Sequence, residues 1–144
     1  IGQIVTERSG CDLKEPKLIL LMTNGRFCEA LLESTEMILG KMERVAAFPL
    51  LPGVSPEEYT AQVGDYLEEN GQSACVLTDI QGGTPCNVAH ALSRKYDLDV
   101  FSGLNMAMLI YLDELRQQGK EGQDMAKDLL HTATSSIQYL EKQS

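Results

Sequence analysis

The apolar run from Leu18 to Met22 is the feature of this sequence that most limits how the chain can fold. A strand that is apolar at consecutive positions must be covered on both faces, which is the usual situation of a strand inside a parallel sheet. Parallel neighbours are joined by crossover connections of about a dozen or more residues, and these are usually helices. A strand over 18–23 therefore predicts an α/β domain with helices on both sides of a sheet.

The rest of the chain alternates short β-rich runs with longer helical patterns, as this prediction requires. We expect further strands over 45–51, 73–78 and 98–102, and helices over 26–39, 56–69, 85–94, 105–118 and 123–134. The stretch 135–140 either continues the last helix or forms a short strand. Because such alternation is typical of right-handed βαβ units, the predicted fold is a three-layer α/β domain around a central parallel sheet.

Two of the predicted helices carry distinct local signals. In the helix over 26–39, apolar or small residues recur at the i, i+3, i+4 spacing of a helix that packs one face against a sheet. These residues are Phe27, Ala30, Leu31, Ser34, Met37 and Ile38. Ser55 and Pro56 supply an N-cap and a first-turn proline, so we expect the next helix to begin sharply at Pro56.

The length of 144 residues fits a single domain, which we place at 16–144. The segment 1–15 is then an N-terminal extension or an added tail, and it lacks the apolar core of a signal peptide. No apolar run approaches the roughly 20 residues of a membrane-spanning helix. The four cysteines are far apart and form no CxxC pair, a pattern that suits a reducing compartment. We therefore expect a cytoplasmic protein.

The charge of the chain restricts its partners. The formal net charge is −9, and no cluster of Lys and Arg interrupts it. An acidic surface repels the phosphate backbone of nucleic acids, so we expect no nucleic-acid partner. A basic protein partner is favoured instead.

A glycine-rich segment follows the third predicted strand, at the edge where ligands gather in an open parallel sheet. It contains Asp79, Gly82, Gly83 and Thr84. The glycines let the backbone bend or another group come close, and Thr84 is expected to cap the helix that Pro85 begins. The N–H groups at such a helix start favour an anion such as phosphate. The plainer interpretation is a strand-to-helix connection with an Asp turn, and the segment alone does not choose between the two.

A second polar segment follows the first predicted strand. It consists of Thr23, Asn24, Gly25 and Arg26. Asn-Gly is a common turn dipeptide, so a purely structural turn is one interpretation. Arg26 adds a cation suited to a phosphate or a carboxylate and is a candidate anion clamp. His90 and His131 lie on predicted helices away from the strand ends, so we expect both outside the site, which is predicted to use no metal and no cofactor.

Taken in order, the motifs between Lys17 and Leu140 resemble the enzyme IIA component of mannose-family (mannose/fructose/sorbose) phosphoenolpyruvate-dependent sugar phosphotransferase systems. They are T-N-G-R after the first strand, D-I-Q-G-G-T-P-C-N from Asp79, and S-G-L-N-M-A-M-L from Ser102. The patterns D-x-x-G-G-[ST]-P-x-N and [SA]-G-x-N-x-x-M-L behind a T-x-G turn are specific as a set. The resemblance implies the strand order 2-1-3-4 and a homodimer that exchanges an antiparallel C-terminal strand, here 135–140.

The resemblance also implies a phosphoprotein of sugar transport. Such a protein accepts phosphate from the histidine phosphocarrier protein and passes it to a IIB component, with the membrane IIC/IID complex as an indirect partner. In the family, a histidine directly after the strand-one threonine carries the phosphate, and the aspartate that ends strand three orients it. Asn24 and Asp79 occupy these two positions here. The accompanying candidates for binding phosphate or a partner are Thr23, Gly25, Arg26, Gly82, Gly83 and Thr84.

Asn24 is the departure from the family pattern that decides how much function the resemblance implies. A neutral imidazole offers a basic lone pair to phosphorus, whereas the amide nitrogen of asparagine has its lone pair delocalised into the carbonyl. The Asn24 amide can still donate a hydrogen bond to Asp79. We therefore expect a folded site without phosphoryl transfer. It is either the product of a laboratory change of histidine or the site of a natural homologue that now binds or regulates.

Two other α/β classes fit the chain less well. A response-regulator receiver needs an acidic pair after the first strand to bind magnesium, and this chain has Met22, Thr23 and Asn24 there. A flavodoxin needs a Ser/Thr-rich phosphate loop and aromatic residues around the flavin, and only Thr23 and Phe27 are near. The remaining alternative is a non-catalytic regulatory or partner-binding homologue built on the same fold.

Overall fold

The computed structural model describes residues 15–144, so most of the predicted N-terminal extension lies outside the described residues. The elements of the described part follow the predicted order. They are β1 Leu18–Asn24, α2 Phe27–Leu39, β2 Val45–Leu50, α3 Pro56–Asn70, β3 Ser73–Thr78, α4 Thr84–Leu92, β4 Asp97–Ser102, α5 Met106–Gln117 and α6 Gly122–Ser135. None of the helices in 15–144 combines the length and the apolar character that crossing a bilayer requires.

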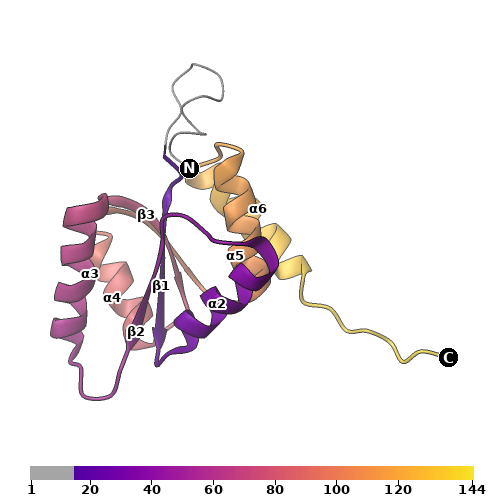
Figure 1. The fold of residues 1–144 in the computed structure, drawn as a ribbon, viewed down its shortest axis with the longest axis horizontal. Helices are drawn as coiled ribbons and strands as arrows, with labels where there is room; N and C mark the ends of the chain where they lie inside the picture. The colour runs from indigo at the N-terminus through magenta and orange to yellow at the C-terminus, as the bar shows by residue number, and fades with distance from the viewer. Residues whose placement is uncertain (1–14) are drawn as a thin grey trace.

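The strands form one parallel sheet in the order β2-β1-β3-β4, which confirms the predicted strand order. Helices α3 and α4 cover one face, and α2, α5 and α6 cover the other (Figure 1). The apolar run in β1 serves both layers. Ile19 and Leu21 pack into the core under α2, α5 and α6, whereas Leu18, Leu20 and Met22 pack into the core under α3 and α4. The consecutive apolar pattern thus marks a strand covered on both faces, as predicted.

Helix α2 turns a different face to the core than its spacing predicts. Of the predicted apolar set only Leu31 is buried, while Phe27 is 45% exposed and Met37 is 82% exposed. The buried face consists of Cys28, Leu31 and Thr35. The start of the helix is fixed because the Cys28 N–H donates to the Thr23 hydroxyl over 3.0 Å, which sets Cys28 inward. The Thr35 hydroxyl is satisfied inside the helix by the Leu31 carbonyl at 2.7 Å, so a threonine can be buried there.

The start of α3 agrees with its sequence signal. The Ser55 hydroxyl accepts the Glu58 N–H at 3.0 Å, and the Glu58 carboxylate accepts the Ser55 N–H at 3.0 Å, which makes a complete capping box. Pro56 is the first residue of the helix, as predicted. Local chemistry alone therefore placed this helix start correctly.

The last helix, α6, ends at Ser135, and residues 137–144 form neither helix nor strand in the single chain. Three apolar side chains in this tail are strongly exposed. They are Ile137 at 77%, Tyr139 at 87% and Leu140 at 80%. The predicted continuation of the helix therefore stops at the first residue of the ambiguous stretch. The short strand, which the family resemblance assigns to a contact with a second chain, remains a prediction.

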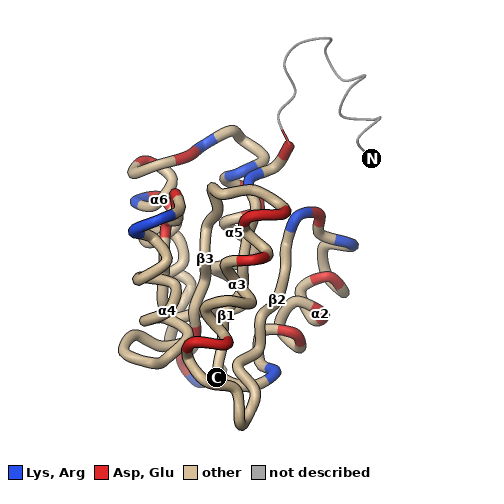
Figure 2. The backbone as a smooth tube through the Cα atoms, turned by 90° about the vertical axis from the view of Figure 1, so that its left-hand side faces the viewer, with Lys and Arg blue, Asp and Glu red and all other residues tan. Residues whose placement is uncertain are grey.

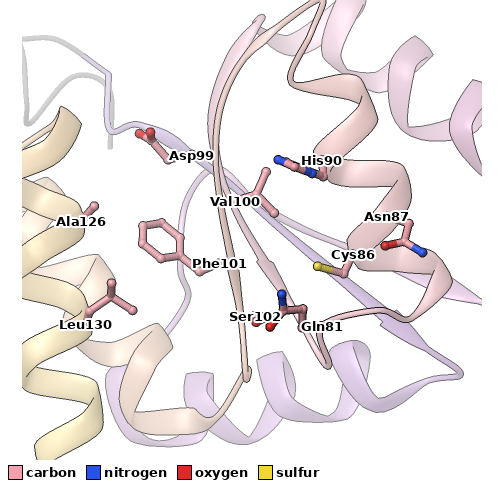
Figure 3. Close-up of a pocket in the computed structure, with 10 residues that line it drawn as sticks. All are labelled: Gln81, Cys86, Asn87, His90, Asp99, Val100, Phe101, Ser102, Ala126 and Leu130. Atoms are coloured by element: carbon pink, nitrogen blue, oxygen red, sulfur yellow. The ribbon is translucent and has the colours of Figure 1, made fainter.

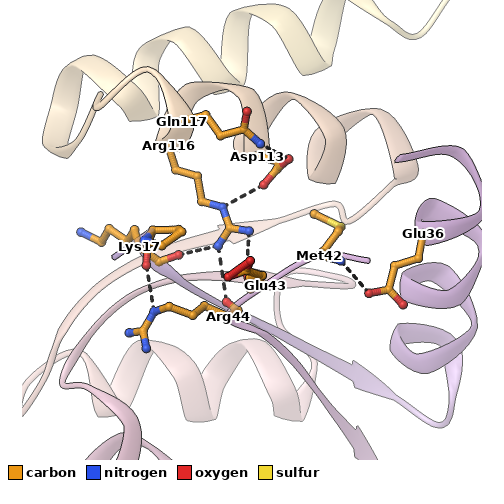
Figure 4. Close-up of polar contacts among 9 residues, drawn as sticks. Lys17, Glu36, Met42, Glu43, Arg44, Asp113, Arg116 and Gln117 are labelled. Atoms are coloured by element: carbon orange, nitrogen blue, oxygen red, sulfur yellow. Dashed lines mark hydrogen bonds and ion pairs between the residues drawn. The ribbon is translucent and has the colours of Figure 1, made fainter. Parts of the chain in front are cut away.

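At the edge where β1 and β2 begin, Arg116 of α5 joins segments that are far apart in the sequence (Figure 4). Its guanidinium donates to the carbonyl oxygens of Lys17 at 2.6 Å, Glu43 at 2.7 Å and Arg44 at 3.4 Å. The Nε–H donates to the Asp113 carboxylate at 2.9 Å, and the Arg116 side chain is only 4% exposed. This buried cation therefore holds α5 against the start of two strands.

Candidate functional site

The site lies where the two central strands, β1 and β3, end next to each other. Asn24 is the last residue of β1, and Asp79 directly follows β3. The Asn24 backbone N–H donates to Asp79 Oδ2 at 2.7 Å, and the Asn24 side-chain Nδ2 donates to the same oxygen at 3.0 Å. The contact between the Asn24 amide and the Asp79 carboxylate is thus present as expected. The roles of these residues in phosphoryl transfer remain a prediction.

Asp79 is held by its own loop as well as by Asn24. Its second carboxylate oxygen, Oδ1, accepts the Ile80 N–H at 2.9 Å. Its backbone carbonyl accepts the N–H of Gly103, which follows β4, at 3.2 Å. Both carboxylate oxygens therefore have donors, and the orientation of the carboxylate is fixed from two loops.

The turn after β1 is organised by Thr23, which is buried. Its hydroxyl accepts the Cys28 N–H at 3.0 Å and donates to the Gly25 carbonyl at 3.2 Å. Gly25 has a φ of +64°, and its N–H donates to the Leu50 carbonyl of β2 at 2.8 Å. A left-handed conformation favours glycine here. Thr23 and Gly25 therefore shape the turn that carries Asn24.

Arg26, the candidate anion clamp, is paired within its own helix. Its Nη1 lies 3.0 Å from the Glu29 carboxylate, and its side chain is 69% exposed. An exposed ion pair of this kind contributes little free energy, so an incoming anion can compete for the guanidinium. The position next to Asn24 is compatible with the predicted role, which stays a prediction.

The glycine-rich loop after β3 approaches Asn24 closely. Gly82 has a φ of +88°. A Cβ added at Gly83 would lie 3.4 Å from Asn24 Nδ2 and 3.1 Å from the side chain of Ile80. Gly82 therefore allows the backbone to bend, and Gly83 leaves room for the Asn24 side chain. These are the two roles that the sequence predicts for glycines in this loop.

The expected capping role of Thr84 is wrong. The N-cap of α4 is Gly83, which is in an extended conformation, and Thr84 is the first residue inside the helix. The Asn87 N–H donates to the Gly83 carbonyl at 3.0 Å, which is the first hydrogen bond of the helix. The helix therefore begins one residue before the predicted start at Pro85. No side chain caps this helix, which leaves the first N–H groups of α4 without a side-chain acceptor.

The loop after β4 also borders the site, although it is not among the predicted site segments. The Leu104 N–H donates to the Thr78 carbonyl at 3.0 Å, and the Gly103 N–H donates to the Asp79 carbonyl. These bonds tie the loop to the end of β3. The S-G-x-N pattern from Ser102 is the sequence signal for this loop, but only the sheet order places the loop beside Asp79.

Two protonated groups near the site offer no alternative nucleophile. Burial raises the pKa of the Cys28 thiol above its ordinary value. Burial, followed by repulsion from Cys28 when that thiol is ionised and from the Asp79 carboxylate, raises the pKa of the Tyr59 hydroxyl, which donates to the Phe48 carbonyl at 2.5 Å. Both groups therefore stay protonated at neutral pH, and neither is activated for attack on phosphorus.

Beside the site, a groove of 540 Å³ runs between α4, the outer strand β4 and α6 (Figure 3). Its lining residues are Gln81, Cys86, Asn87, His90, Asp99, Val100, Phe101, Ser102, Ala126 and Leu130. His90 of α4 therefore lines the groove, and it is not among the hydrogen-bond partners of Asn24 or Asp79. His131 is exposed on α6.

The fold and the site together define the class: a doubly wound parallel α/β domain with a polar, glycine-lined site at the carboxyl ends of its central strands. A family model described as "PTS system fructose IIA component" matches residues 18–129. The chain belongs to this mannose-type IIA family of phosphotransferase-system proteins.

Individual relatives agree with this assignment. The chain is 33% identical over 97 residues to the PTS system mannose-specific EIIAB component of Escherichia coli (strain K12), a match of 64% of this chain and 29% of that protein. It is 31% identical over 104 residues to the PTS system fructose-specific EIIA component of Bacillus subtilis (strain 168), which covers 69% of this chain and 70% of that protein. The chain thus spans less than a third of the length of the first relative.

Solved structures show the same fold. The mannose/sorbose specific IIA subunit of the phosphotransferase system from Enterococcus faecalis superposes with a TM-score of 0.78 at 34% identity, covering 91% of this chain and 98% of that chain. Phosphotransferase system component EIIA from Streptococcus agalactiae gives a TM-score of 0.78 at 29% identity, covering 85% of this chain and 95% of that chain. Both likenesses extend over nearly the whole of the described fold.

Proposed function

We propose that this chain has the docking surface and the site of a IIA phosphocarrier domain but does not carry phosphate, because Asn24 replaces the acceptor. The observation that supports this is the double hydrogen bond from Asn24 to Asp79 Oδ2, at 2.7 Å and 3.0 Å. The amide occupies the place of an imidazole and satisfies the aspartate, but its nitrogen has no free lone pair for phosphorus. The site is therefore preserved without its nucleophile.

Asp79 has the position that a phosphoryl-accepting histidine needs. A histidine at position 24 would attack phosphorus with one ring nitrogen while the other N–H donates to Asp79 Oδ2. The new phosphorus–nitrogen bond forms as the bond to the donor protein's histidine breaks, and the carboxylate stabilises the positive charge on the ring. The uncapped start of α4 offers N–H groups to the phosphate oxygens.

The surroundings of the site suit a basic protein partner with an apolar contact. Phe27 is 45% exposed and Ile80 is 61% exposed, and they follow closely after Asn24 and Asp79 in the chain. Helix α2 carries three glutamates and no Lys or Arg (Figure 2). Exposed apolar residues with an acidic border are typical of a docking surface for a partner of opposite charge. We assign this surface to the histidine phosphocarrier protein and the IIB component, with the membrane IIC/IID complex reached indirectly from the cytoplasm.

A second function, regulation by partner binding, is favoured by the same pair of residues. Because Asn24 is hydrogen-bonded to Asp79 and offers no nucleophile for phosphate, the surface presented to a partner does not change with phosphorylation. Such a chain would bind a transporter or a transcription-control protein in one state only. Binding without phosphoryl uptake distinguishes this function from that of a carrier.

We also propose a homodimer in which the tail after α6 of each chain fills the groove of the other. Strand β4 is an outer strand of the sheet, so its free edge can pair with a further strand. Phe101 and Leu130 line the groove beside that edge, and Leu130 is 51% exposed. The tail offers apolar side chains in alternation at Ile137 and Tyr139, which is the spacing of a strand with one buried face.

Intact mass spectrometry tests the carrier proposal. The chain is incubated with phosphoenolpyruvate, enzyme I and the histidine phosphocarrier protein, in parallel with Asn24→His and with Asn24→His combined with Asp79→Asn. We expect no added phosphate on the unchanged chain, one acid-labile phosphate on Asn24→His, and much slower uptake in the double variant. A phosphate on the unchanged chain would refute the proposal.

The homodimer is tested by light scattering after size exclusion. Removal of residues 137–144 is expected to convert a dimer into a monomer. The matched control replaces Met37 and Ile38 of α2 by serine, because these apolar residues are also strongly exposed but do not line the groove. A dimer that survives the truncation but not the α2 change would show that the interface is elsewhere.

A further inference from the structure

Two glycine loops surround Asp79, and an asparagine side chain holds the carbonyl of each. Asn87 Nδ2 donates to the Gly82 carbonyl at 3.3 Å. Asn105 Nδ2 donates to the Gly103 carbonyl at 3.2 Å. Gly82 and Gly103 both have a left-handed backbone, with φ of +88° and +92°. The same device, an amide donor on the carbonyl of a left-handed glycine, thus occurs on both sides of the aspartate.

Both loops bond directly to Asp79 or to its neighbour. The Gly103 N–H donates to the Asp79 carbonyl at 3.2 Å. On the other side, the Ile80 N–H donates to Asp79 Oδ1 at 2.9 Å, and the Gly83 N–H closes the turn onto the Ile80 carbonyl at 3.2 Å. A change in either glycine loop therefore moves a hydrogen-bond partner of Asp79.

The two asparagines are attached to rigid elements. Asn87 lies in the first turn of α4, where its backbone N–H bonds to the Gly83 carbonyl. Asn105 is the N-cap of α5, where its Oδ1 accepts the Met108 N–H at 2.9 Å. Each side chain therefore links a loop to the helix that follows it, so that the helix fixes the position of the loop.

We propose that Asn87 and Asn105 are positioning residues that set the orientation of the Asp79 carboxylate toward residue 24. Each belongs to one of the two sequence motifs, and within these motifs the two asparagines had no assigned role. The proposal rests on the proposed phosphocarrier role of the site, because orientation of Asp79 matters only if a group at position 24 uses it.

The structure offers substitutions that remove the amide donor without removing other functions. Asn105→Ser keeps a hydroxyl that can cap α5 but has no amide to reach the Gly103 carbonyl. Asn87→Ala removes the donor to Gly82. The matched control is Asn70→Ala, because Asn70 Nδ2 donates to the Tyr66 carbonyl at 3.0 Å at the end of α3, where the same chemical change leaves the site untouched.

The first readout is amide hydrogen exchange in the otherwise unchanged chain. We expect exchange at the Asn24 and Ile80 backbone N–H groups to rise about fivefold in Asn87→Ala and in Asn105→Ser, since a net hydrogen bond is worth about 1 kcal/mol. Exchange in the Asn70→Ala control should stay at the level of the unchanged chain. Exchange rates at both N–H groups that match the control would overturn the proposal.

The second readout is the pKa of the imidazole in Asn24→His, measured by NMR titration. A well-placed Asp79 carboxylate favours the charged ring and raises its pKa above the ordinary value of about 6.5. Adding Asn87→Ala or Asn105→Ser should lower that pKa by about half a unit, whereas adding Asn70→Ala should not. If the asparagines only stabilise the fold, Asn87→Ala and Asn105→Ser would lower the unfolding midpoint but leave the imidazole pKa unchanged. That result would overturn the proposal.

Phosphoryl uptake separates this proposal from the proposed function. If Asn24→His accepts phosphate, the two positioning variants should slow uptake about fivefold or more with the binding of the phosphocarrier protein unchanged. If Asn24→His accepts none, the carrier function fails, and the imidazole pKa and the amide exchange still decide the positioning role. Where Asn87→Ala does not fold, Asn87→Asp keeps the shape of the side chain, presents acceptors only, and serves in the same measurements.

Discussion

Replacement of Arg116 by methionine is expected to destabilise the domain by about 3–5 kcal/mol, the range found when one partner of a buried ion pair is removed. The change keeps much of the apolar length of the side chain and deletes the guanidinium, which donates to three backbone carbonyls and to Asp113. The Lys17 and Glu43 carbonyls then lose the donors that lie at 2.6 Å and 2.7 Å.

The magnitude follows from burial and charge. The side chains of Arg116 and Asp113 are 4% and 14% exposed, so water screens their contact poorly. Hydrogen bonds to a charged group each contribute about 1.5–3 kcal/mol, and the two short ones to carbonyls alone reach the lower end of the expected loss. The remaining Asp113 carboxylate has no cation beside it and adds a desolvation penalty. Against a total stability of about 5–15 kcal/mol the loss is large.

Urea unfolding followed by far-UV circular dichroism measures the change, since the chain has no Trp for fluorescence. Two companion variants separate the contributions. Arg116→Lys keeps the charge but not the fork of donors and should lie between the unchanged chain and Arg116→Met. Arg116→Met combined with Asp113→Leu removes the stranded carboxylate and should recover part of the loss. A loss below about 1 kcal/mol in Arg116→Met would refute the reasoning, because an exposed pair behaves that way.

The remaining predictions concern the cap of α3 and the glycine loop after β3. Ser55→Ala should lower the unfolding free energy by about 1 kcal/mol, and the contribution of the capping partner Glu58 should depend on pH. Hydrogen bonds from Ser55 lower the pKa of Glu58 in the folded state. The stabilisation by the Glu58 carboxylate is therefore complete above its unfolded-state pKa of about 4.3 and is lost as the pH falls through its folded-state pKa. Comparing the acid dependence of the unfolding free energy between the unchanged chain and Glu58→Gln checks this. Gly83→Ala should shift the NMR signals of the Asn24 side-chain amide, because the added Cβ would lie 3.4 Å from it. At Gly82 an added Cβ would meet no atom within 4 Å, but the φ of +88° strains any other residue. Gly82→Ala should therefore lower the unfolding free energy by about 1–2 kcal/mol and shift the Asn24 amide signals less than Gly83→Ala does.

Much of the fold follows from local chemistry that a sequence displays directly. The consecutive apolar residues from Leu18 require cover on both faces, and the capping box at Ser55 sets a helix start. The ends of β1 at Asn24 and of β3 at Thr78 agree with the predicted strands to within a residue, because turns and glycines mark them. These features depend on residues within a few positions of one another in the chain, so they can be predicted without coordinates.

Two local expectations were wrong, each for its own physical reason. Spacing alone could not choose the buried face of α2, because the choice depends on the Thr23 hydroxyl fixing Cys28 inward. The cap of α4 was misplaced by one residue because Gly83 satisfies the extended geometry without any side chain. At α2 a contact with the end of β1 thus outweighed a local preference of a few tenths of a kcal/mol, whereas at α4 the backbone geometry of a glycine took the place of a side-chain cap.

Residue type and short spacing are enough to predict the α/β class, the motif positions and the presence of an amide side chain at position 24. Which groups meet depends on the tertiary structure. It joined Asn24 to Asp79 across 55 positions and Arg116 to Lys17 across 99 positions. Hydrogen bonds of this range depend on strand order and helix placement, which arise from the packing of the whole core and not from any one segment.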